Sequence, residues 1–227
     1  MEEWYKEQEE YADWAKGIEE GAIRSSTENL WIYKEKIYNE TIMKYSTIGA
    51  MGLEIGSGAG RTCKFLKENK RIVIGVDPLS HKNVYNLVTD LLFSSVGENL
   101  PFKSNSFDFV MTKDTLDHVI SPQKVFYEVN RLLKDGSHFI VCQDVKVKDD
   151  SHRHVYEIET LKELGRRSNF ELLHMIPIHI HLPIPSWKLR TALRKSKLYL
   201  KLNRVLAIIL SRYANNLIFV FKKINKN

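Results

Sequence analysis

The chain has 227 residues, 43% of them hydrophobic, and a formal net charge of +6 at pH 7. This length supports one well-buried core with appendages but not two full domains. The chain has only two cysteines, at no metal-like spacing, which excludes a disulfide framework. No apolar run is long enough to span a bilayer, and the acidic N-terminus is unlike a signal peptide. We therefore expect a cytoplasmic protein.

Residues 1–45 have a helical, aromatic-rich composition and are predicted to form an N-terminal helical arm. Alternating strand and helix patterns follow. Strands are expected at 50–55, 71–76, 91–96, 107–112, 138–145, 170–181 and 217–224, and helices near 60–69, 121–134 and 157–168. This alternation predicts an α/β fold with a mostly parallel sheet covered on both faces.

A glycine-rich loop after the first strand indicates a nucleotide cradle. Gly56, Gly58 and Gly60 lack Cβ atoms, so the backbone can turn sharply against a ligand. The sixth loop position is an arginine, which departs from the dinucleotide fingerprint. Glu54 at the strand tip suits a cationic amino group, and Asp77 after the second strand can accept hydrogen bonds from both ribose hydroxyls. The pattern therefore predicts a nucleoside with a cationic, amino-acid-like arm.

Six motifs in register carry a family resemblance. They are Leu-Glu-Ile-Gly-Ser-Gly-Ala-Gly at 53–60, Gly-Val-Asp-Pro at 75–78, Gly-Glu-Asn-Leu-Pro-Phe at 97–102, Asn-Ser-Phe-Asp-Phe-Val at 105–110, Leu-Asp-His-Val at 116–119 and Glu-Val-Asn-Arg-Leu-Leu-Lys-Asp-Gly at 128–136. Over roughly residues 45–175 the chain resembles class I S-adenosylmethionine-dependent methyltransferases of the methyltransferase domain 11-like subgroup. The resemblance implies a Rossmann-like three-layer sandwich with a seven-stranded sheet whose last strand is antiparallel.

The same resemblance implies roles for individual cofactor-binding residues of S-adenosyl-L-methionine. The methionine moiety would be contacted by Glu54, Gly56, Ser57, Gly58 and Gly60, and the ribose by Asp77. The adenine would lie along Pro78 and Leu79, and its polar edge would be bordered by Gly97 and Glu98. The sulfonium would be flanked by Thr112 and Lys113. Val96 stands where the family usually has an acid for the adenine amino group, and Glu98 or a backbone carbonyl would substitute. In the family, an N-terminal arm commonly closes over the cofactor, although an ordinary packing helix fits this sequence equally well.

Catalysis is predicted to rest mainly on positioning, because a sulfonium methyl is already activated. For a hydroxyl acceptor, His118 is the candidate base and Asp117 or Asp114 would orient it, while a packing or helix-start role for His118 is an equal alternative. Histidines spaced two apart, at 152 and 154 and at 179 and 181, lack an accompanying carboxylate or cysteine cluster, so no metal site is expected.

The C-terminal region is strongly basic, with eleven Lys and Arg and no acidic residue after Glu171. On one continuous helix, a basic stripe would form from Arg190, Arg194, Lys197, Lys201 and Arg204. An apolar stripe would lie beside it, built from Leu198, Leu202, Val205, Ile209 and Tyr213 and widened by Leu206 and Leu210. A basic face beside an apolar one suits an anionic membrane surface. The alternative is that the apolar stripe packs on the sheet.

The predicted organisation is an arm at 1–45, a cofactor-binding core at 46–182, a basic helical insertion at 183–215 and a final strand and tail at 216–227. The predicted function is methyl transfer, with O-methylation favoured, to a lipidic or lipid-linked saccharide or other small-molecule acceptor at the cytoplasmic membrane face. The alternatives are a nucleic-acid methyltransferase, disfavoured because the aromatic-proline motifs of base methylases are lacking, and a non-catalytic S-adenosylmethionine-binding module. The acceptor's identity and the oligomeric state do not follow from the sequence.

Overall fold

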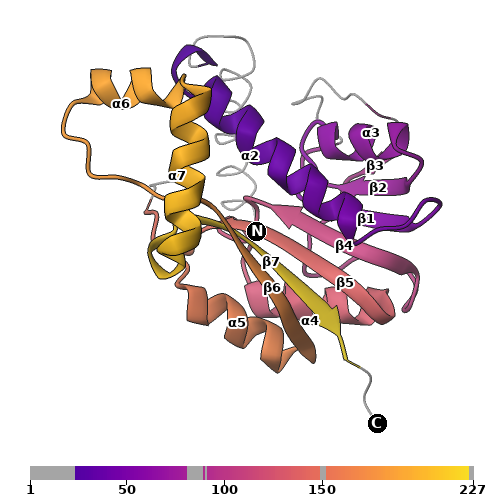
Figure 1. Cartoon of the computed structure of the whole chain (residues 1–227). Helices are drawn as coiled ribbons and strands as arrows, with labels where there is room; N and C mark the ends of the chain where they lie inside the picture. Colours follow the sequence, from indigo (N-terminus) through magenta and orange to yellow (C-terminus); the bar gives the residue numbers. More distant parts are fainter. Residues whose placement is uncertain (1–23, 81–88, 90, 149–151, 225–227) are drawn as a thin grey trace.

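A computed structural model describes residues 24–80, 89, 91–148 and 152–224 (Figure 1). Its seven-stranded sheet has the order β3-β2-β1-β4-β5-β7-β6. In chain order the strands are β1 Met51–Ile55, β2 Ile72–Val76, β3 Leu92–Phe93, β4 Phe107–Lys113, β5 Leu133–Asp144, β6 Phe170–His179 and β7 Asn216–Lys223. Strand β7 runs antiparallel to both of its neighbours, whereas the pairs among β1 to β5 are parallel. The predicted fold class is confirmed.

Helices cover both faces of the sheet, as a mostly parallel sheet requires. They are α2 Arg24–Lys44, α3 Arg61–Glu68, α4 Pro122–Leu132, α5 Ile158–Arg167, α6 Trp187–Arg194 and α7 Lys197–Ile209, followed by a short 3-10 turn, Ser211–Tyr213. Helices α2 and α3 share one core cluster with the sheet, and α4 and α5 share the other. The alternation along β5 shows this directly, since Phe139 and Val141 face α4 and α5 whereas Ile140 and Cys142 face α2 and α3.

Two predicted boundaries are wrong for local reasons. Strand β3 consists of Leu92 and Phe93 alone, because only these residues pair with β2 in the described part of the chain, and Val96 instead bridges to Asn99. Helix α4 ends at Leu132 rather than near residue 134, and the next residue is already extended in β5. Lys134, Asp135 and Gly136, which lie at the predicted end of the helix, are therefore inside the start of a strand.

The predicted single basic stripe is also wrong, because the insertion forms two helices. Helix α6 ends at Arg194 and α7 begins at Lys197, with the Ser196 hydroxyl accepting a hydrogen bond from the Tyr199 N–H at 3.3 Å. The five cations consequently do not share one helix face. Of the helices in the described ranges, none combines the length and apolarity that crossing a bilayer needs.

Helix α7 is fixed to the sheet edge by a buried amide. Asn203, 2% exposed, donates to the Ile180 carbonyl at 2.9 Å and accepts from the Ile180 N–H at 3.1 Å. This pairing uses backbone groups just beyond the end of β6 that would otherwise lie buried without partners. The buried side of α7 is thus held against β6, and its opposite side faces outward.

Arg71 attaches the end of α2 to the sheet. Its guanidinium donates to the carbonyls of Asn69 and Ser46, both at 2.6 Å, and to that of Met43 at 3.4 Å. Arg71 is only 8% exposed, so these carbonyls have little access to water as a substitute partner. The arginine therefore determines where α2 lies across the sheet.

We predict that Arg71→Met lowers the free energy of unfolding by about 2–3 kcal/mol, because several buried carbonyls lose their donor. Urea denaturation followed by circular dichroism measures this change. The control is Lys64→Met, at an exposed lysine on α3. A loss at Arg71 no larger than that of the control would contradict the anchoring role.

Candidate active site

The glycine loop between β1 and α3 folds tightly against the end of β2. Gly56, Gly58 and Gly60 have φ values of 74°, 49° and 83°, a region that side-chain-bearing residues rarely adopt. A Cβ on Gly56 would lie 2.1 Å from Thr115 Oγ1, so this position needs glycine for space as well. The Gly56 N–H donates to the Val76 carbonyl at 2.8 Å. The loop backbone is thereby held at the carboxyl ends of two adjacent strands, where open α/β sheets bind ligands.

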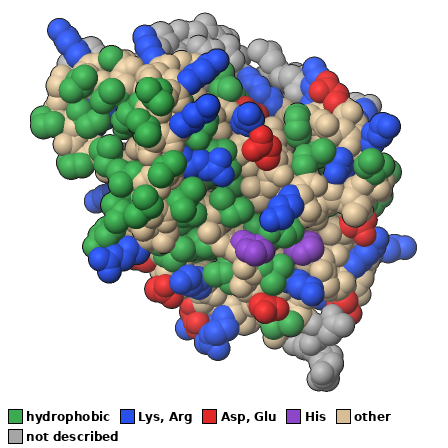
Figure 2. All heavy atoms as spheres, viewed as in Figure 1, with side chains coloured by type: hydrophobic (Ala, Val, Ile, Leu, Met, Phe, Trp, Pro, Cys, Tyr) green, Lys and Arg blue, Asp and Glu red, His purple; other side chains and the backbone are tan. Residues whose placement is uncertain are grey.

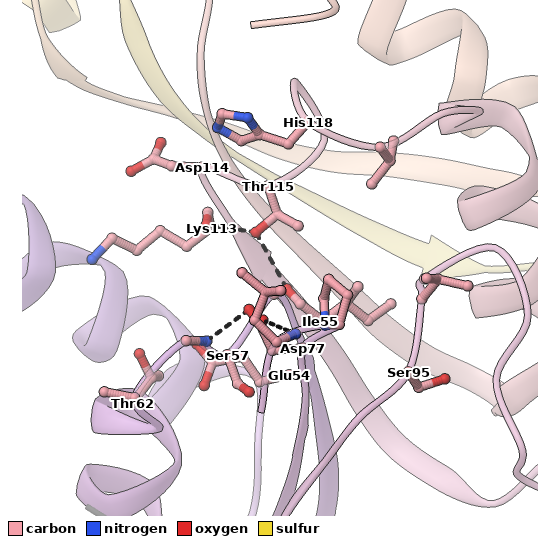
Figure 3. A pocket seen from close by; sticks show the side chains of 18 of the residues that line it. Glu54, Ile55, Ser57, Thr62, Asp77, Ser95, Lys113, Asp114, Thr115 and His118 are labelled. Atoms are coloured by element: carbon pink, nitrogen blue, oxygen red, sulfur yellow. Dashed lines mark hydrogen bonds between the residues drawn. The ribbon is translucent and has the colours of Figure 1, made fainter. Parts of the chain in front are cut away.

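Asp77 links this loop to the end of β2. One carboxylate oxygen accepts from the Gly58 N–H at 3.1 Å and the other from the Leu79 N–H at 3.0 Å, as the dashed lines of Figure 3 show in part. Burial raises the pKa of Asp77, and the two backbone N–H groups oppose that rise. These two hydrogen bonds fix the carboxylate beside the pocket.

Glu54 lies at the tip of β1 and is 3% exposed. Burial raises the pKa of its carboxyl to about 7, although the Cys63 thiol donates to it at 3.1 Å. A cationic partner stabilises a buried carboxylate more strongly than one exposed to water, because the local dielectric constant is lower. Glu54 is therefore suited to bind an ammonium group.

These residues surround a cavity of about 260 Å³. The residues predicted from the sequence that line it are Glu54, Gly56, Ser57, Gly58, Asp77, Pro78, Leu79, Gly97, Glu98, Lys113, Asp114 and His118. Three others do not, namely Gly60, Thr112 and Asp117. Thr112 is fully buried, and its hydroxyl donates to the Ile55 carbonyl at 3.0 Å, which joins β4 to β1 instead of facing the cavity.

On the opposite wall, Glu98 is already engaged with the protein. Its carboxylate accepts from the N–H groups of Ile120 at 2.8 Å and Ser121 at 3.1 Å, just before α4 begins. This arrangement satisfies backbone donors at the start of that helix. Val96 also lines the cavity, between Ser95 and Gly97, at the position where the family usually has an acid.

Helix α2 contributes residues that the sequence did not single out. Trp31 and Glu35 line the cavity, and Lys113 Nζ lies 4.9 Å from the centre of the Trp31 ring. Arg61, at the start of α3, lies 5.6 Å from the same ring. The aromatic residues of the arm were the only signal in the sequence that pointed to such contacts. The sequence did not indicate which residues of the helix would face the glycine loop. Closure of the arm over a ligand stays a prediction.

A group of acidic and histidine side chains lies across the cavity from Glu54 and Asp77 (Figure 3). Burial and the negative charge of Asp144 raise the pKa of Asp114 to about 6. His118 also faces the cavity. Asp117 lies behind it, with carboxylate oxygens 3.8 Å from His118 Nε2 and 3.2 Å from His152 Nε2. The sequence did not predict the contact between His152 and Asp117, because His152 belongs to a separate loop.

Comparisons with known proteins agree with this geometry. Residues 53–141 match the family model of a methyltransferase domain. An uncharacterized protein of Methanocaldococcus jannaschii is 34% identical over 120 residues, which cover 50% of this chain and 53% of that protein. The chain thus spans about half the length of this curated relative.

Two solved structures extend the likeness to the whole fold. A Haloferax volcanii protein in complex with the methyltransferase activator Trm112 is 17% identical, with a TM-score of 0.67 and 98% of each chain covered. An S-adenosylmethionine-dependent methyltransferase from Archaeoglobus fulgidus is 16% identical, with a TM-score of 0.62 and coverage of 84% of this chain and 94% of the other. At these identities the comparisons establish the fold.

We predict that Asp77→Ala weakens binding of S-adenosylhomocysteine at least tenfold, because the variant loses the expected acceptor for the ribose hydroxyls and leaves the Gly58 N–H without its partner. Isothermal titration calorimetry measures the affinity. Asp135→Ala, at an exposed carboxylate paired with Lys223, is the control and should bind like the wild type. Equal affinity of a folded Asp77 variant would contradict the assignment.

A second prediction concerns pH. Because the pKa of Glu54 is about 7, its carboxylate is lost as pH falls through 7, and affinity for S-adenosylmethionine should fall with it. Below pH 7 we expect the affinity to fall by up to about a factor of ten per pH unit, so the titration should cover pH 7.5 to 6. Fluorescence or calorimetric titration follows it.

The control ligand is 5′-methylthioadenosine, which lacks the amino-acid arm and should bind independently of pH over this range. In Glu54→Gln, the affinity for S-adenosylmethionine should become as independent of pH as the affinity for 5′-methylthioadenosine. A wild-type affinity for S-adenosylmethionine that stays constant between pH 6 and 7.5 would contradict the role of Glu54.

Proposed function

We propose that this chain, whose residues 53–141 match the family model of a methyltransferase domain, is an S-adenosylmethionine-dependent methyltransferase that methylates an acceptor presented at an anionic membrane surface. The observation that carries the membrane part of the proposal is the exposed apolar face of α7. The donor part is supported by the cavity at the carboxyl ends of β1, β2 and β4.

In the donor pocket, each part of S-adenosylmethionine has a matching wall. Glu54 would hold the amino group, the 56–58 loop the rest of the methionine arm and Asp77 the ribose, while Pro78, Leu79, Gly97 and Glu98 would border the adenine. Lys113 has its charge near the Trp31 ring of α2. This contact would keep the ammonium group on the ring face, and the Trp31 ring, which lines the cavity, can attract a cationic sulfonium in the same way.

The proposed chemistry is O-methylation by direct displacement. A bond forms between the acceptor oxygen and the methyl carbon, the carbon–sulfur bond breaks with its electron pair going to sulfur, and the hydroxyl proton passes to a base. His118 and Asp114 both face the cavity and are the candidate bases. With a pKa of about 6, Asp114 is mostly ionised at neutral pH and can accept a proton.

The outer side of α7 and the turn after it exposes a continuous set of large apolar side chains. They are between 38 and 72% exposed: Leu198, Leu202, Val205, Ile208, Ile209, Leu210 and Tyr213. Figure 2 shows the hydrophobic area on the side of the molecule that carries α6 and α7. Side chains gathered in this way on one surface mark a site of contact with a partner or a membrane.

Exposed cations flank this apolar face. Lys197 and Lys201 are exposed on α7 and Arg212 on the following turn, and the sequence has no acidic residue after Glu171. Apolar side chains with adjacent lysines and arginines match the boundary between acyl chains and anionic headgroups. A chain bound there would meet lipidic or lipid-linked saccharide acceptors, which is why we favour that class. A nucleic-acid partner would leave the apolar side chains without a role.

We predict that the protein sediments with vesicles containing phosphatidylglycerol and remains partly bound at raised salt, because the apolar contacts are not screened. The double variant Leu202→Asp, Ile209→Asp should lose most of this binding. Tyr127→Ser, at a similarly exposed side chain on α4, should bind like the wild type.

Two outcomes would contradict the membrane proposal. One is complete release of the wild type by salt, which indicates contact through charge alone, and the other is unchanged binding of the double variant. Methyl transfer itself is tested with labelled S-adenosylmethionine and a membrane lipid extract, in which label should reach the organic phase with the wild type but not with Asp77→Ala.

A further inference from the structure

Asp117, His118 and His152 form a compact cluster that the predicted methyl-transfer chemistry does not explain. One ligand atom from each side chain lies within 4.8 Å of the other two. The imidazole rings of His118 and His152 meet edge to face, with their centroids 5.2 Å apart. Two imidazole rings and a carboxylate thus lie close together, and one of them, His118, lines the donor cavity.

The cluster is built from two chain segments that backbone hydrogen bonds hold together. Asp117 and His118 follow β4, whereas His152 belongs to the loop after β5. The N–H groups of Arg153 and His154 donate to the Asp117 carbonyl at 2.8 and 3.2 Å. His154 Nε2 lies 2.9 Å from the Val119 carbonyl, so this ring helps to fix the loop. His152 is consequently placed beside the Asp117 carboxylate by the fold.

We propose that Asp117, His118 and His152 bind a divalent first-row transition metal ion. Imidazole nitrogens with one carboxylate suit Zn²⁺, Fe²⁺ or Co²⁺ better than Mg²⁺ or Ca²⁺, which prefer oxygen ligands. Metal–ligand bonds are about 2.0–2.2 Å, so ligand atoms around one ion lie roughly 3 Å apart. The Asp117–His152 distance of 3.2 Å already meets this requirement, and the Asp117–His118 distance of 3.8 Å needs only a small closure.

The burial of Asp117 gives independent support. The residue is 2% exposed, and its Oδ1 accepts no hydrogen bond from the residues that the structure describes. A buried carboxylate oxygen without a hydrogen bond is destabilising unless a cation compensates its charge. This oxygen lies on the side of His118, where a bound metal ion would contact it.

The cluster revises the expectation that the chain has no metal site. That expectation considered histidines two residues apart, whereas the ligands proposed here pair His152 with a carboxylate and a histidine more than thirty positions earlier. Because the fold alone brings them together, no spacing pattern in the sequence could reveal the set.

The position suggests what the metal would do, and this step rests on the proposed function. His118 lines the donor cavity, so an ion bound to it would lie at the cavity's edge. A metal-bound imidazole cannot also accept the hydroxyl proton, so with the ion in place Asp114 is the base. Three protein ligands leave coordination positions open for an oxygen of the acceptor. Lewis-acid coordination lowers the pKa of a hydroxyl and orients it for attack. The acceptor class favoured by such an ion is an alcohol or phenol with a second oxygen nearby.

The test is calorimetric titration of the tag-free, chelator-treated full chain with Zn²⁺, and with Mg²⁺ as the comparison ion. We expect one equivalent of Zn²⁺ to bind and Mg²⁺ to bind far more weakly. His152→Ala should weaken Zn²⁺ binding at least tenfold, because one of three ligands is lost. His181→Ala is the matched control, since His181 is exposed and lies outside the cluster, and it should bind Zn²⁺ like the wild type.

Co²⁺ absorption provides a second readout at the same site. The wild type should develop a visible band on addition of Co²⁺ that His152→Ala lacks, while both proteins keep the same near-ultraviolet circular dichroism and the same affinity for S-adenosylhomocysteine. The proposal is overturned if the wild type binds no Zn²⁺ saturably, or if a folded His152→Ala binds it as tightly as the wild type. Because donor binding is measured separately, failure of the metal site does not depend on the methyltransferase proposal.

Discussion

The hydrogen bond from the Gly58 N–H to the Asp77 carboxylate is the interaction on which the donor site depends. It joins the glycine loop after β1 to the end of β2, and the bond from Gly56 N–H to the Val76 carbonyl reinforces the same junction. Both strands lie in the middle of the parallel part of the sheet, where pairing on both sides keeps their ends in place. The cradle is therefore held in place by the protein's own hydrogen bonds, which reduces the ordering cost of binding.

Around this junction, the remaining walls come from elements with separate structural duties. Glu98 accepts hydrogen bonds before α4, and Trp31 on α2 lies near Lys113. Arg71 holds the other end of α2 against the sheet. The cavity is thus bordered by residues whose positions the core determines. The side that we propose for the acceptor is lined by Asp114 and His118.

Much of the core could be predicted from the sequence, because its signals are local. The Gly56 to Gly60 pattern and Asp77 follow apolar strands directly, and both predicted strand ends are confirmed to within a residue. Contacts between distant segments were not predictable in the same way. Trp31 reaches the cavity through the register of α2, His152 reaches Asp117 through a loop, and the single basic stripe was interrupted by a two-residue break at Ser196 that periodicity does not reveal.

The central claim is that the cavity between β1, β2 and β4 binds S-adenosylmethionine. Calorimetric titration of the purified wild-type chain with S-adenosylmethionine, S-adenosylhomocysteine and NAD tests it most directly. The account predicts saturable one-to-one binding of the first two ligands and none of NAD, because the sixth loop position is Arg61 and Glu54 would repel a pyrophosphate. A folded chain that bound neither sulfur ligand, or that bound NAD equally well, would contradict it.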